Sequence, residues 1–362
     1  MILMKNCSNT SLLKSNISSR CISACKQLVF RNDKRRTLMN AFFQTVPGAL
    51  VLLVVGFIGL VKGADFFVEG ASNVAKRLKV PSLIIGLTIV AMGTSLPETA
   101  VSISASLQGS NSLAVSNVTG SNIFNLMVVV GLCAIMQTIA VDKETIKRDI
   151  PYSLLAAVVL VGLGVMGDMT LSRLDGVILL VLFAIFIFMM LRSALNARNN
   201  ASDEDVEVEQ SVLMSLVSIV GGAAGIALGG DWVVDSASTL AMAFGMTETL
   251  VGLTIVAVGT SLPELVTSIV AARKNEVDMA LGNAIGSNVF NILMVLGIAS
   301  AISPITLITN NLFDIAVLIA CTLVVWGVVF KKKELHRPMG IFMVLTYVAY
   351  MAYIIIRDMP TV

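Results

Sequence analysis

Apolar stretches of about 20 residues recur along the chain from residue 46 onward, and an α-helix of that length crosses the hydrocarbon core of a bilayer. The one strongly polar interval between them, residues 192–210, holds Arg192, Arg198 and five acidic residues. The pattern therefore predicts an all-α polytopic membrane protein with ten transmembrane helices, five on each side of this interval. The predicted spans are 46–63, 82–107, 113–138, 151–168, 174–193, 212–230, 248–272, 279–302, 312–330 and 339–356.

The same pattern divides the chain into four parts. Residues 41–193 and 211–362 form two five-helix units, and residues 194–210 form the linker between them. Residues 1–40 are rich in Ser, Asn, Lys and Arg and lack the apolar core of a secretory signal. We expect this N-terminal extension to be disordered or to precede the true initiator, Met39, and an organelle transit peptide is the alternative.

Composition narrows the class of protein. Hydrophobic residues make up 56% of the 362 positions and charged residues 13%, whereas a soluble domain carries about 25% charged residues. A net charge of +2 gives no indication of nucleic-acid binding. One His and five dispersed Cys argue against His-based catalysis, a multi-His metal site and a disulfide framework. We therefore expect no enzyme, no cofactor and no obligatory protein partner.

Basic residues are unevenly distributed over the predicted loops. The loops after spans 1, 3, 5, 7 and 9 hold fourteen Lys and Arg residues, Arg148 among them, and the opposite loops with the C-terminus hold two, Arg173 and Arg357. Because cytoplasmic loops carry the excess of Lys and Arg, the linker is predicted to be cytoplasmic and both termini to lie outside.

Two sequence blocks occur twice in the same register. GLTIVAMGTSLPETAVSISA (86–105) returns as GLTIVAVGTSLPELVTSIVA (252–271), with fifteen of twenty residues identical, and NVTGSNIFN (117–125) returns as NAIGSNVFN (283–291). The two blocks keep the same separation from each other in both copies, which indicates a duplicated structural unit. Five spans per unit is an odd number, so the second unit enters the membrane from the opposite side, as in the inverted repeats of secondary transporters.

Glu98 and Glu264 are the decisive residues of the first block. Each lies within an apolar stretch, where a carboxylate costs at least about 2.5 kcal/mol unless a cation or proton matches it. Two equivalent carboxylates from inverted units are expected to meet near the bilayer midplane and to create a charge of about −2. Their hard oxygen atoms favour Na⁺, Ca²⁺ or Mg²⁺.

Each of these glutamates follows a proline, which has no N–H to donate to the carbonyl four residues earlier. Irregular backbone at membrane depth is tolerated where it lines a cavity or is buried in protein. The carbonyls of residues 91–94 and 257–260 are therefore candidate cation ligands, and nearby hydroxyl groups add further oxygen atoms. The hydroxyl candidates are Thr94, Ser95, Thr260 and Ser261.

The second block supplies neutral oxygen atoms. Ser121 and Asn125 are four residues apart, as are Ser287 and Asn291, so each pair shares one helical face. A single Ser or Asn of this kind is equally well explained by an interhelical hydrogen bond, but the recurrence of the whole set favours the ion site. Asp65 and Glu69 also recur, as Asp231 and Asp235. We interpret these four residues as lying at a pathway mouth or a helix end.

The doubled GTSLPE and GSNxFN blocks resemble the alpha repeats of the calcium/cation antiporter superfamily, in particular prokaryotic-type sodium/calcium exchangers of the inner (plasma) membrane. The resemblance implies ten helices and four ion sites in a diamond. It implies a Ca²⁺ site made by Glu98, Glu264 and the oxygens of Thr94 and Thr260, and Na⁺ sites that share the glutamates, with Asn125 and Asn291 at the middle. The Na⁺ sites would use Ala91, Ser95, Ser121, Ala257, Ser261 and Ser287.

Some relatives in this superfamily carry Asp in place of one of these asparagines, and potassium-dependent exchangers use such an Asp. Two Asn residues therefore weaken the case for potassium dependence. The chain also lacks the large cytoplasmic regulatory domain of animal exchangers, so calcium regulation through such a domain is not expected.

These features favour an antiporter that exchanges Na⁺ for Ca²⁺ by alternating access and extrudes Ca²⁺ with the Na⁺ gradient. Its partners are then the two ions and the lipid bilayer. A Ca²⁺/H⁺ or other cation/proton antiporter is the alternative in the same class, and a cation channel is an alternative in another. A membrane-embedded hydrolase lacks a convincing pair of nucleophile and base.

Overall fold

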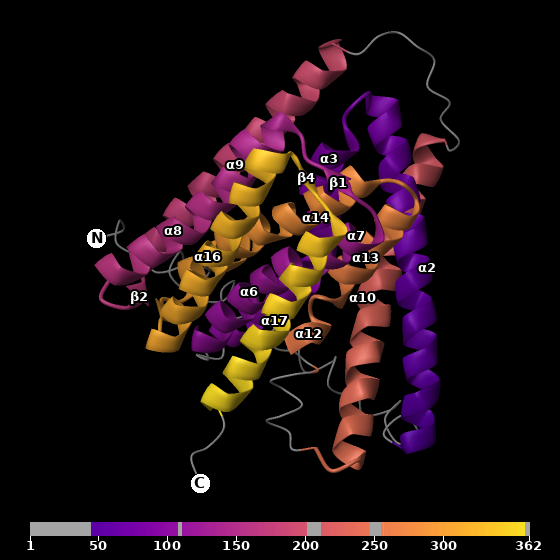
Figure 1. Ribbon diagram of the computed structural model, residues 1–362. Helices are drawn as coiled ribbons and strands as arrows, with labels where there is room; N and C mark the ends of the chain where they lie inside the picture. Colours follow the sequence, from indigo (N-terminus) through magenta and orange to yellow (C-terminus); the bar gives the residue numbers. More distant parts are fainter. Residues whose placement is uncertain (1–44, 108–110, 201–210, 247–254, 256, 359–362) are drawn as a thin grey trace, which may run out of the picture.

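The computed structural model describes residues 45–107, 111–200, 211–246, 255 and 257–358 as a bundle of helices (Figure 1). The prediction for residues 1–40 lies outside these described residues, as does most of the predicted linker. The elements before the linker are α2 (Val46–Leu78), α3 (Ser82–Ile85), η1 (Gly86–Val90), α4 (Ala91–Thr94), α5 (Leu96–Leu107), α6 (Asn111–Phe124), η2 (Asn125–Val129), α7 (Val130–Met136), β1 (Ile139–Ala140), η3 (Thr145–Asp149), α8 (Ile150–Met166), β2 (Thr170–Leu171) and α9 (Arg173–Asn200). The elements after it are α10 (Val212–Ala243), α12 (Ala257–Gly259), α13 (Leu262–Arg273), α14 (Val277–Val289), η5 (Phe290–Val295), α15 (Leu296–Ile302), β3 (Ile305–Thr306), α16 (Thr309–Lys332), β4 (Glu334–Leu335) and α17 (Arg337–Asp358).

Among the described residues, eight helices are long and apolar enough to cross a membrane. A ninth span is obtained if Ser82–Thr94 and Leu96–Ile103, which are bent by 46° relative to each other, are taken as one. The predicted span 248–272 lies partly outside the described residues. The chain is thus a helical membrane protein that crosses the bilayer many times.

Three helices extend further than the hydropathy pattern predicts. α2 and α10 contain 33 and 32 residues, although the pattern ended their spans at residues 63 and 230. α9 continues to Asn200, so the first part of the predicted linker 194–210 is helical. The reason is that Ala, Leu and Arg favour helix whether or not a residue lies in lipid, so helices continue beyond the apolar stretch.

α2 and α10 lie side by side along one edge of the molecule (Figure 1). Glycines allow this close contact, because a Cβ atom on Gly63 would lie 2.7 Å from the backbone nitrogen of Ile226, and one on Gly229 would lie 2.5 Å from that of Leu60. Small residues at such contacts are typical of helix association in membranes. The two long helices therefore form a pair that places equivalent elements of the two halves against each other.

The elements recur in the register of the sequence blocks. α2 begins at Val46 and α10 at Val212, and α7 begins at Val130 and α15 at Leu296, so both pairs start at equivalent positions of the repeat. Four short strands, which the sequence pattern does not predict, form two antiparallel pairs that each join one half to the other: Ile139 pairs with Leu335, and Leu171 with Ile305. Backbone hydrogen bonds between strands thus connect the two halves of the chain.

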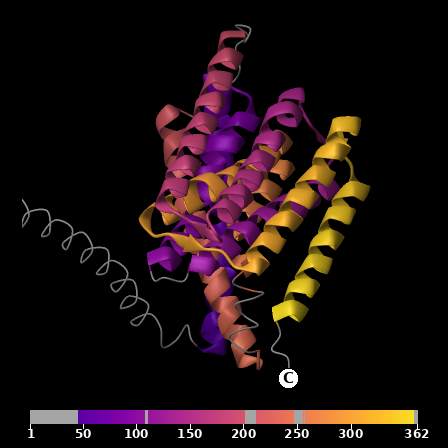
Figure 2. The ribbon, with the colours of Figure 1, turned by 90° about the vertical axis from the view of Figure 1, so that its left-hand side faces the viewer.

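The helices that carry the second sequence block lie at the centre of the bundle. In the most apolar stretches of Ala114–Met136 and Val277–Ile302, 83% and 78% of the residues are buried, compared with 17% in Arg337–Arg357. That last stretch belongs to α17, which lies at the outer edge of the bundle in Figure 2. Polar side chains on the central helices are therefore shielded from lipid by the surrounding ones.

Candidate functional site

Two interrupted helices carry the glutamates. Ser95 separates α4 from α5 with φ −83° and ψ 10°, and Ser261 precedes α13 with φ −97° and ψ 6°. Glu98 and Glu264 lie in the first turns of α5 and α13, where the helix dipole stabilises a negative charge. The interruption expected from the two prolines is present, and it falls on the serine two residues before each proline.

Both glutamate side chains are fully buried, and the two carboxyl groups lie close enough to interact electrostatically. Ser95 Oγ donates a hydrogen bond to Glu264 Oε1 over 3.0 Å, which links the first half to the second. Ser261 lies near the Glu98 carboxyl group, but among the described residues neither carboxyl oxygen of Glu98 nor Ser261 Oγ makes a hydrogen bond of normal geometry. The structure thus brings the two acidic groups together, as expected from the sequence.

The Ser and Asn residues of the second block are also buried in this region. Ser121 lies on α6 and Ser287 on α14, while Asn125 begins η2 and Asn291 lies in η5. Within the described part of the chain, both serine hydroxyls and both polar atoms of Asn125 lack a hydrogen-bond partner. Of these four residues, Asn291 alone makes an interhelical hydrogen bond to a described side chain, from its Nδ2 to Asn122 Oδ1 over 3.1 Å. Interhelical bonding therefore does not account for most of this set, whose oxygen atoms are available to a cation.

The remaining predicted ligands lie on the interrupted segments. Thr94 is fully buried, and Ala91 begins α4 with its carbonyl accepting the Ser95 N–H over 3.0 Å. Thr260 Oγ1 contacts Asn117 Oδ1 at 3.5 Å. Ala257 begins α12, next to a position that lies outside the described residues.

Four asparagines that the sequence pattern did not single out belong to the same region. Asn122 and Asn288 donate hydrogen bonds to each other's carbonyl oxygens over 3.0 and 3.1 Å. Asn117 and Asn283 contact the hydroxyls of Thr260 and Thr94. All four occupy equivalent positions in the two copies of the second block, and this recurrence is the signal that could have identified them.

The other recurring acidic residues serve a different purpose. Lys274, at the end of α13, lies 3.8 Å from Asp65 Oδ1 and 3.7 Å from Glu69 Oε2 on α2. These side chains are about one third exposed, and their ion pairs with Lys274 join α2 to the end of α13.

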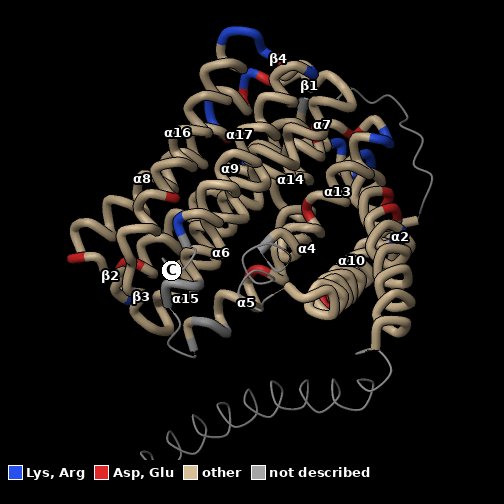
Figure 3. The backbone as a smooth tube through the Cα atoms, turned by 60° about the horizontal axis from the view of Figure 1, so that its bottom comes forward, with Lys and Arg blue, Asp and Glu red and all other residues tan. Residues whose placement is uncertain are grey.

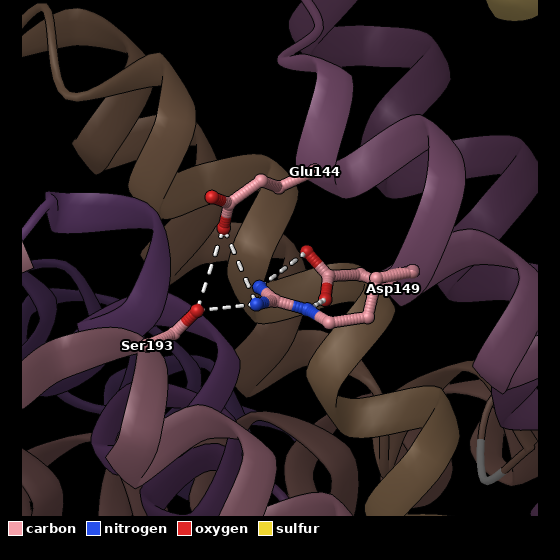
Figure 4. Close-up of polar contacts among 4 residues, drawn as sticks. Glu144, Asp149 and Ser193 are labelled. Carbon is pink, nitrogen blue, oxygen red and sulfur yellow. Dashed lines mark hydrogen bonds and ion pairs between the residues drawn. The ribbon is translucent and has the colours of Figure 1, made fainter. Parts of the chain in front are cut away.

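A second charged cluster lies at the start of α8 (Figure 4). Buried Asp149 accepts a hydrogen bond from Arg148 Nε over 2.7 Å, and the same guanidinium contacts Glu144 and Ser193 of α9. The prediction that Arg148 lies in a loop is therefore wrong, because the helix already begins at Thr145. One guanidinium is shared by two carboxylates and the Ser193 hydroxyl, and these contacts connect α9 to the segment before α8, which is a structural role.

Among the described residues, no group of three or more His, Cys, Asp or Glu side chains is arranged to hold a metal ion. The glutamate pair differs from such a resident metal centre because it combines two carboxylates with neutral hydroxyl, amide and carbonyl oxygens. That donor set suits hard cations that bind and leave.

Comparisons with known proteins agree with this chemistry. The family described as "Sodium/calcium exchanger protein" matches the chain twice, over residues 48–192 and 214–356. The putative antiporter CaxA of Alkalimonas amylolytica is 38% identical over 320 residues, which cover 83% of this chain and 97% of that protein. The sodium/calcium exchanger MaX1 of Methanosarcina acetivorans is 32% identical over 339 residues, with the same coverage of both proteins.

The solved structures give the same assignment. A structure of the sodium-calcium exchanger NCX_Mj, soaked with Na⁺ and Sr²⁺, superposes with a TM-score of 0.74 at 34% identity and covers 85% of this chain and 99% of that one. Both the doubled family match and this superposition extend over the two halves that contribute the glutamates. The chain therefore belongs to the sodium/calcium exchanger family and is an integral membrane transporter, not an enzyme.

Proposed function

We propose that this protein exchanges Na⁺ for Ca²⁺ across the membrane by alternating access and that the inward Na⁺ gradient drives Ca²⁺ out. The observation that supports this most directly is the buried pair Glu98 and Glu264, surrounded by oxygen atoms that have no hydrogen-bond partner among the described residues. Two carboxylates carry a charge of about −2, which one Ca²⁺ or several Na⁺ neutralise. Because both ions need the same carboxylates, they compete, and this competition couples the two fluxes.

The proposed ligands follow the repeat. Ca²⁺ would use both glutamates with the oxygens of Thr94 and Thr260. Na⁺ would share the glutamates and use a wider set of neutral oxygens, with Asn125 and Asn291 at the middle. This wider set is Ala91, Ser95, Ser121, Ala257, Ser261 and Ser287. An Asn stands at both middle positions, which weakens the case for potassium dependence.

The proposed architecture is ten transmembrane helices in two inverted five-helix repeats, 41–193 and 211–362, joined by the linker 194–210. The equivalent starting positions of α2 and α10 and of α7 and α15 support it, as do the two strand pairs that cross between the halves. An odd number of spans per repeat inverts the second copy. Alternating access then needs only that the two copies exchange conformations around a fixed site.

We further propose that the linker is cytoplasmic, that both termini face outward, and that the membrane is the inner (plasma) membrane. Lys and Arg gather around β1 and β4 and beside α2 and α13 (Figure 3). α9, which leads into the linker, also ends with a basic residue, Arg198, in its last turn. Lys and Arg excess marks the cytoplasmic side.

Reconstitution in proteoliposomes tests the proposal. Vesicles loaded with Na⁺ and diluted into Na⁺-free buffer that contains ⁴⁵Ca²⁺ should take up Ca²⁺, while vesicles loaded with K⁺ or Li⁺ should not. A pH gradient imposed without Na⁺ should drive no uptake. Uptake driven by protons alone would overturn the assignment of Na⁺, and single-channel currents would overturn the carrier mechanism.

A further inference from the structure

Asn283 of α14 occupies a fully buried position between the two interrupted helices. Its Oδ1 lies 3.1 Å from Thr94 Oγ1, in the first half of the chain. Its Nδ2 lies 3.3 Å from the backbone oxygen of Glu264 and 2.9 Å from Ser268 Oγ, both on α13. One side chain thus connects the Thr94 segment with the helix that carries Glu264.

The chemistry of these partners fixes the orientation of the Asn283 amide. A backbone carbonyl only accepts hydrogen bonds, so the group that faces the Glu264 carbonyl must be the amide NH₂. Ser268 is consistent with this orientation, because its hydroxyl donates to the Ala280 carbonyl over 3.5 Å and leaves its lone pairs for Asn283. The amide oxygen of Asn283 therefore faces Thr94.

That orientation determines where the Thr94 proton points. An amide oxygen is an acceptor only, so at 3.1 Å the Thr94 hydroxyl must donate to it. The Val90 and Ala91 carbonyls, at 3.2 and 3.4 Å, and the nearby Glu264 carboxylate compete for the same proton, and Asn283 offers the amide oxygen among these acceptors. When a cation occupies the Glu264 carboxylate, the Asn283 amide oxygen is an acceptor that can take the Thr94 proton and leave the Thr94 lone pairs for the cation.

We propose that Asn283 is a positioning residue for Ca²⁺: it orients the Thr94 hydroxyl so that its lone pairs are available to the ion, and it holds this oxygen at a set distance from the Glu264 helix. The inference rests on the proposed function, because it takes Thr94 and Glu264 as ligands of the same ion. Asn283 itself does not contact the cation in this proposal.

The matching residue in the other half has the same type of partners. Asn117 Nδ2 donates to Ser102 Oγ over 3.2 Å, and its Oδ1 contacts Thr260 Oγ1 at 3.5 Å. The equivalent positions of the repeat are Thr94 and Thr260, Asn283 and Asn117, and Ser268 and Ser102. In each arrangement the Thr comes from one half of the chain, and the Asn and Ser come from the other half. The duplication of this arrangement supports a role in the ion site, because simple packing does not require the same three polar residue types twice.

The test measures Ca²⁺ binding by the purified protein, through the Ca²⁺-dependent shift of its melting temperature, and the KM for Ca²⁺ in vesicles. Asn283→Ala should weaken Ca²⁺ binding and raise this KM by about tenfold, because losing one hydrogen bond of this kind changes an equilibrium by roughly that factor. The maximal rate should change much less than the KM.

Thr94→Val shows whether Asn283 acts through the hydroxyl. In that background, Asn283→Ala should produce little further loss of Ca²⁺ affinity, whereas in a Thr94→Ser background, which keeps the hydroxyl, the loss should return. Losses that simply add in both backgrounds would overturn the proposal.

Asn311→Ala is the matched structural control. Asn311 is equally buried, donates to Ser116 Oγ over 2.9 Å and accepts the Ile308 N–H over 3.0 Å, and it lies on α16, an element that carries no predicted ligand. This variant should lower the melting temperature and leave Ca²⁺ affinity unchanged. If it weakens Ca²⁺ binding as much as Asn283→Ala, the effect is structural and the proposal fails. If the wild-type protein binds Ca²⁺ but a Na⁺ gradient drives no Ca²⁺ uptake into vesicles, the proposed Na⁺/Ca²⁺ exchange is wrong, whatever the outcome for Asn283.

Discussion

The two halves of the proposed ion site have the same sequence, GTSLPE, but different hydrogen bonds. Around Glu264, Ser95 Oγ binds the carboxylate and Asn283 binds the backbone carbonyl. Around Glu98, Ser261 and Glu264 lie near the carboxyl group, but within the described part of the chain neither carboxyl oxygen makes a hydrogen bond of normal geometry. The carboxylate of Glu264 is therefore held by a contact from the other repeat, and that of Glu98 is less constrained.

The two copies also differ in their neighbours outside the repeated blocks. The ring of Phe67 packs against Gly93, where an added Cβ atom would lie 2.7 Å from its Cζ. The position equivalent to Phe67 in the second half is Val233, and there the neighbour of Gly259 is Val234. A duplicated motif thus has two environments, so its two copies can agree in residue types and differ in their contacts.

Glutamine substitution should give the largest effect. Glu98→Gln and Glu264→Gln each remove a charge from the cation site, and truncating one partner of a buried charge pair costs about 2–5 kcal/mol, which corresponds to a loss of roughly thirtyfold or more in Ca²⁺ affinity. Na⁺-dependent ⁴⁵Ca²⁺ flux should be abolished in both variants. Wild-type flux in either one would show that the glutamates are not the shared ligands.

The same variants should differ in stability without ions. Neutralising either carboxylate removes the repulsion between two buried charges, so both should melt at a higher temperature than the wild type in buffer free of Na⁺ and Ca²⁺. The increase should be larger for Glu98→Gln, because Glu98 lacks the hydrogen bond that Ser95 gives to Glu264. A larger increase for Glu264→Gln would reverse the comparison.

Serine-to-alanine substitutions should give an intermediate effect. Ser95→Ala removes a hydrogen bond to a carboxylate and should lower the free energy of unfolding without ions by about 1.5–3 kcal/mol. Ser261→Ala removes a hydroxyl that lies near the Glu98 carboxyl group without a hydrogen bond of normal geometry among the described residues, so it should lower this free energy less than Ser95→Ala does. Chemical unfolding of the two variants in detergent provides the measurement. Equal losses of unfolding free energy would argue against a difference between the surroundings of Glu98 and Glu264.

The smallest difference between matching substitutions is expected for Asn122 and Asn288, which form the same hydrogen bond to each other's backbone. Asn122→Ala and Asn288→Ala each break the reciprocal pair, so both should destabilise the protein. Asn122→Ala should cost about 1 kcal/mol more, because Asn122 Oδ1 also accepts a hydrogen bond from Asn291, and a typical hydrogen bond contributes about that much. Thermal unfolding measures the difference, and a larger loss for Asn288→Ala would contradict it.

Most of the buried polar residues in this region carry a signal in the sequence. Glu98 and Glu264 were recognised because a carboxylate in an apolar stretch needs a counter-charge, and Ser121, Asn125, Ser287 and Asn291 because the set recurs. Asn117, Asn122, Asn283 and Asn288 were overlooked although they recur in the same block. Their roles depend on partners in the other half of the chain, and hydropathy patterns contain no such contacts.

For the helix ends and the short strands, too, the sequence pattern predicts one part of the structure and misses another. The hydropathy pattern found where α2 and α10 begin, but it ended them at residues 63 and 230, whereas the helices continue to Leu78 and Ala243. The pattern measures contact with lipid, and these helices extend past the predicted apolar stretch. The strand pairs of Ile139 with Leu335 and Leu171 with Ile305 consist of two residues per strand, which is too short to give a periodic signal.

The sequence by itself determined the membrane location, the duplication and the identity of the two acidic groups, because burial in lipid restricts composition strongly and a close repeat is visible in any chain. Only the tertiary structure decided which oxygen atoms are bound and which are available, and that the two identical motifs differ. Hydrogen bonds depend on distances of about 3 Å between atoms, and those distances are set by how the two halves pack against each other.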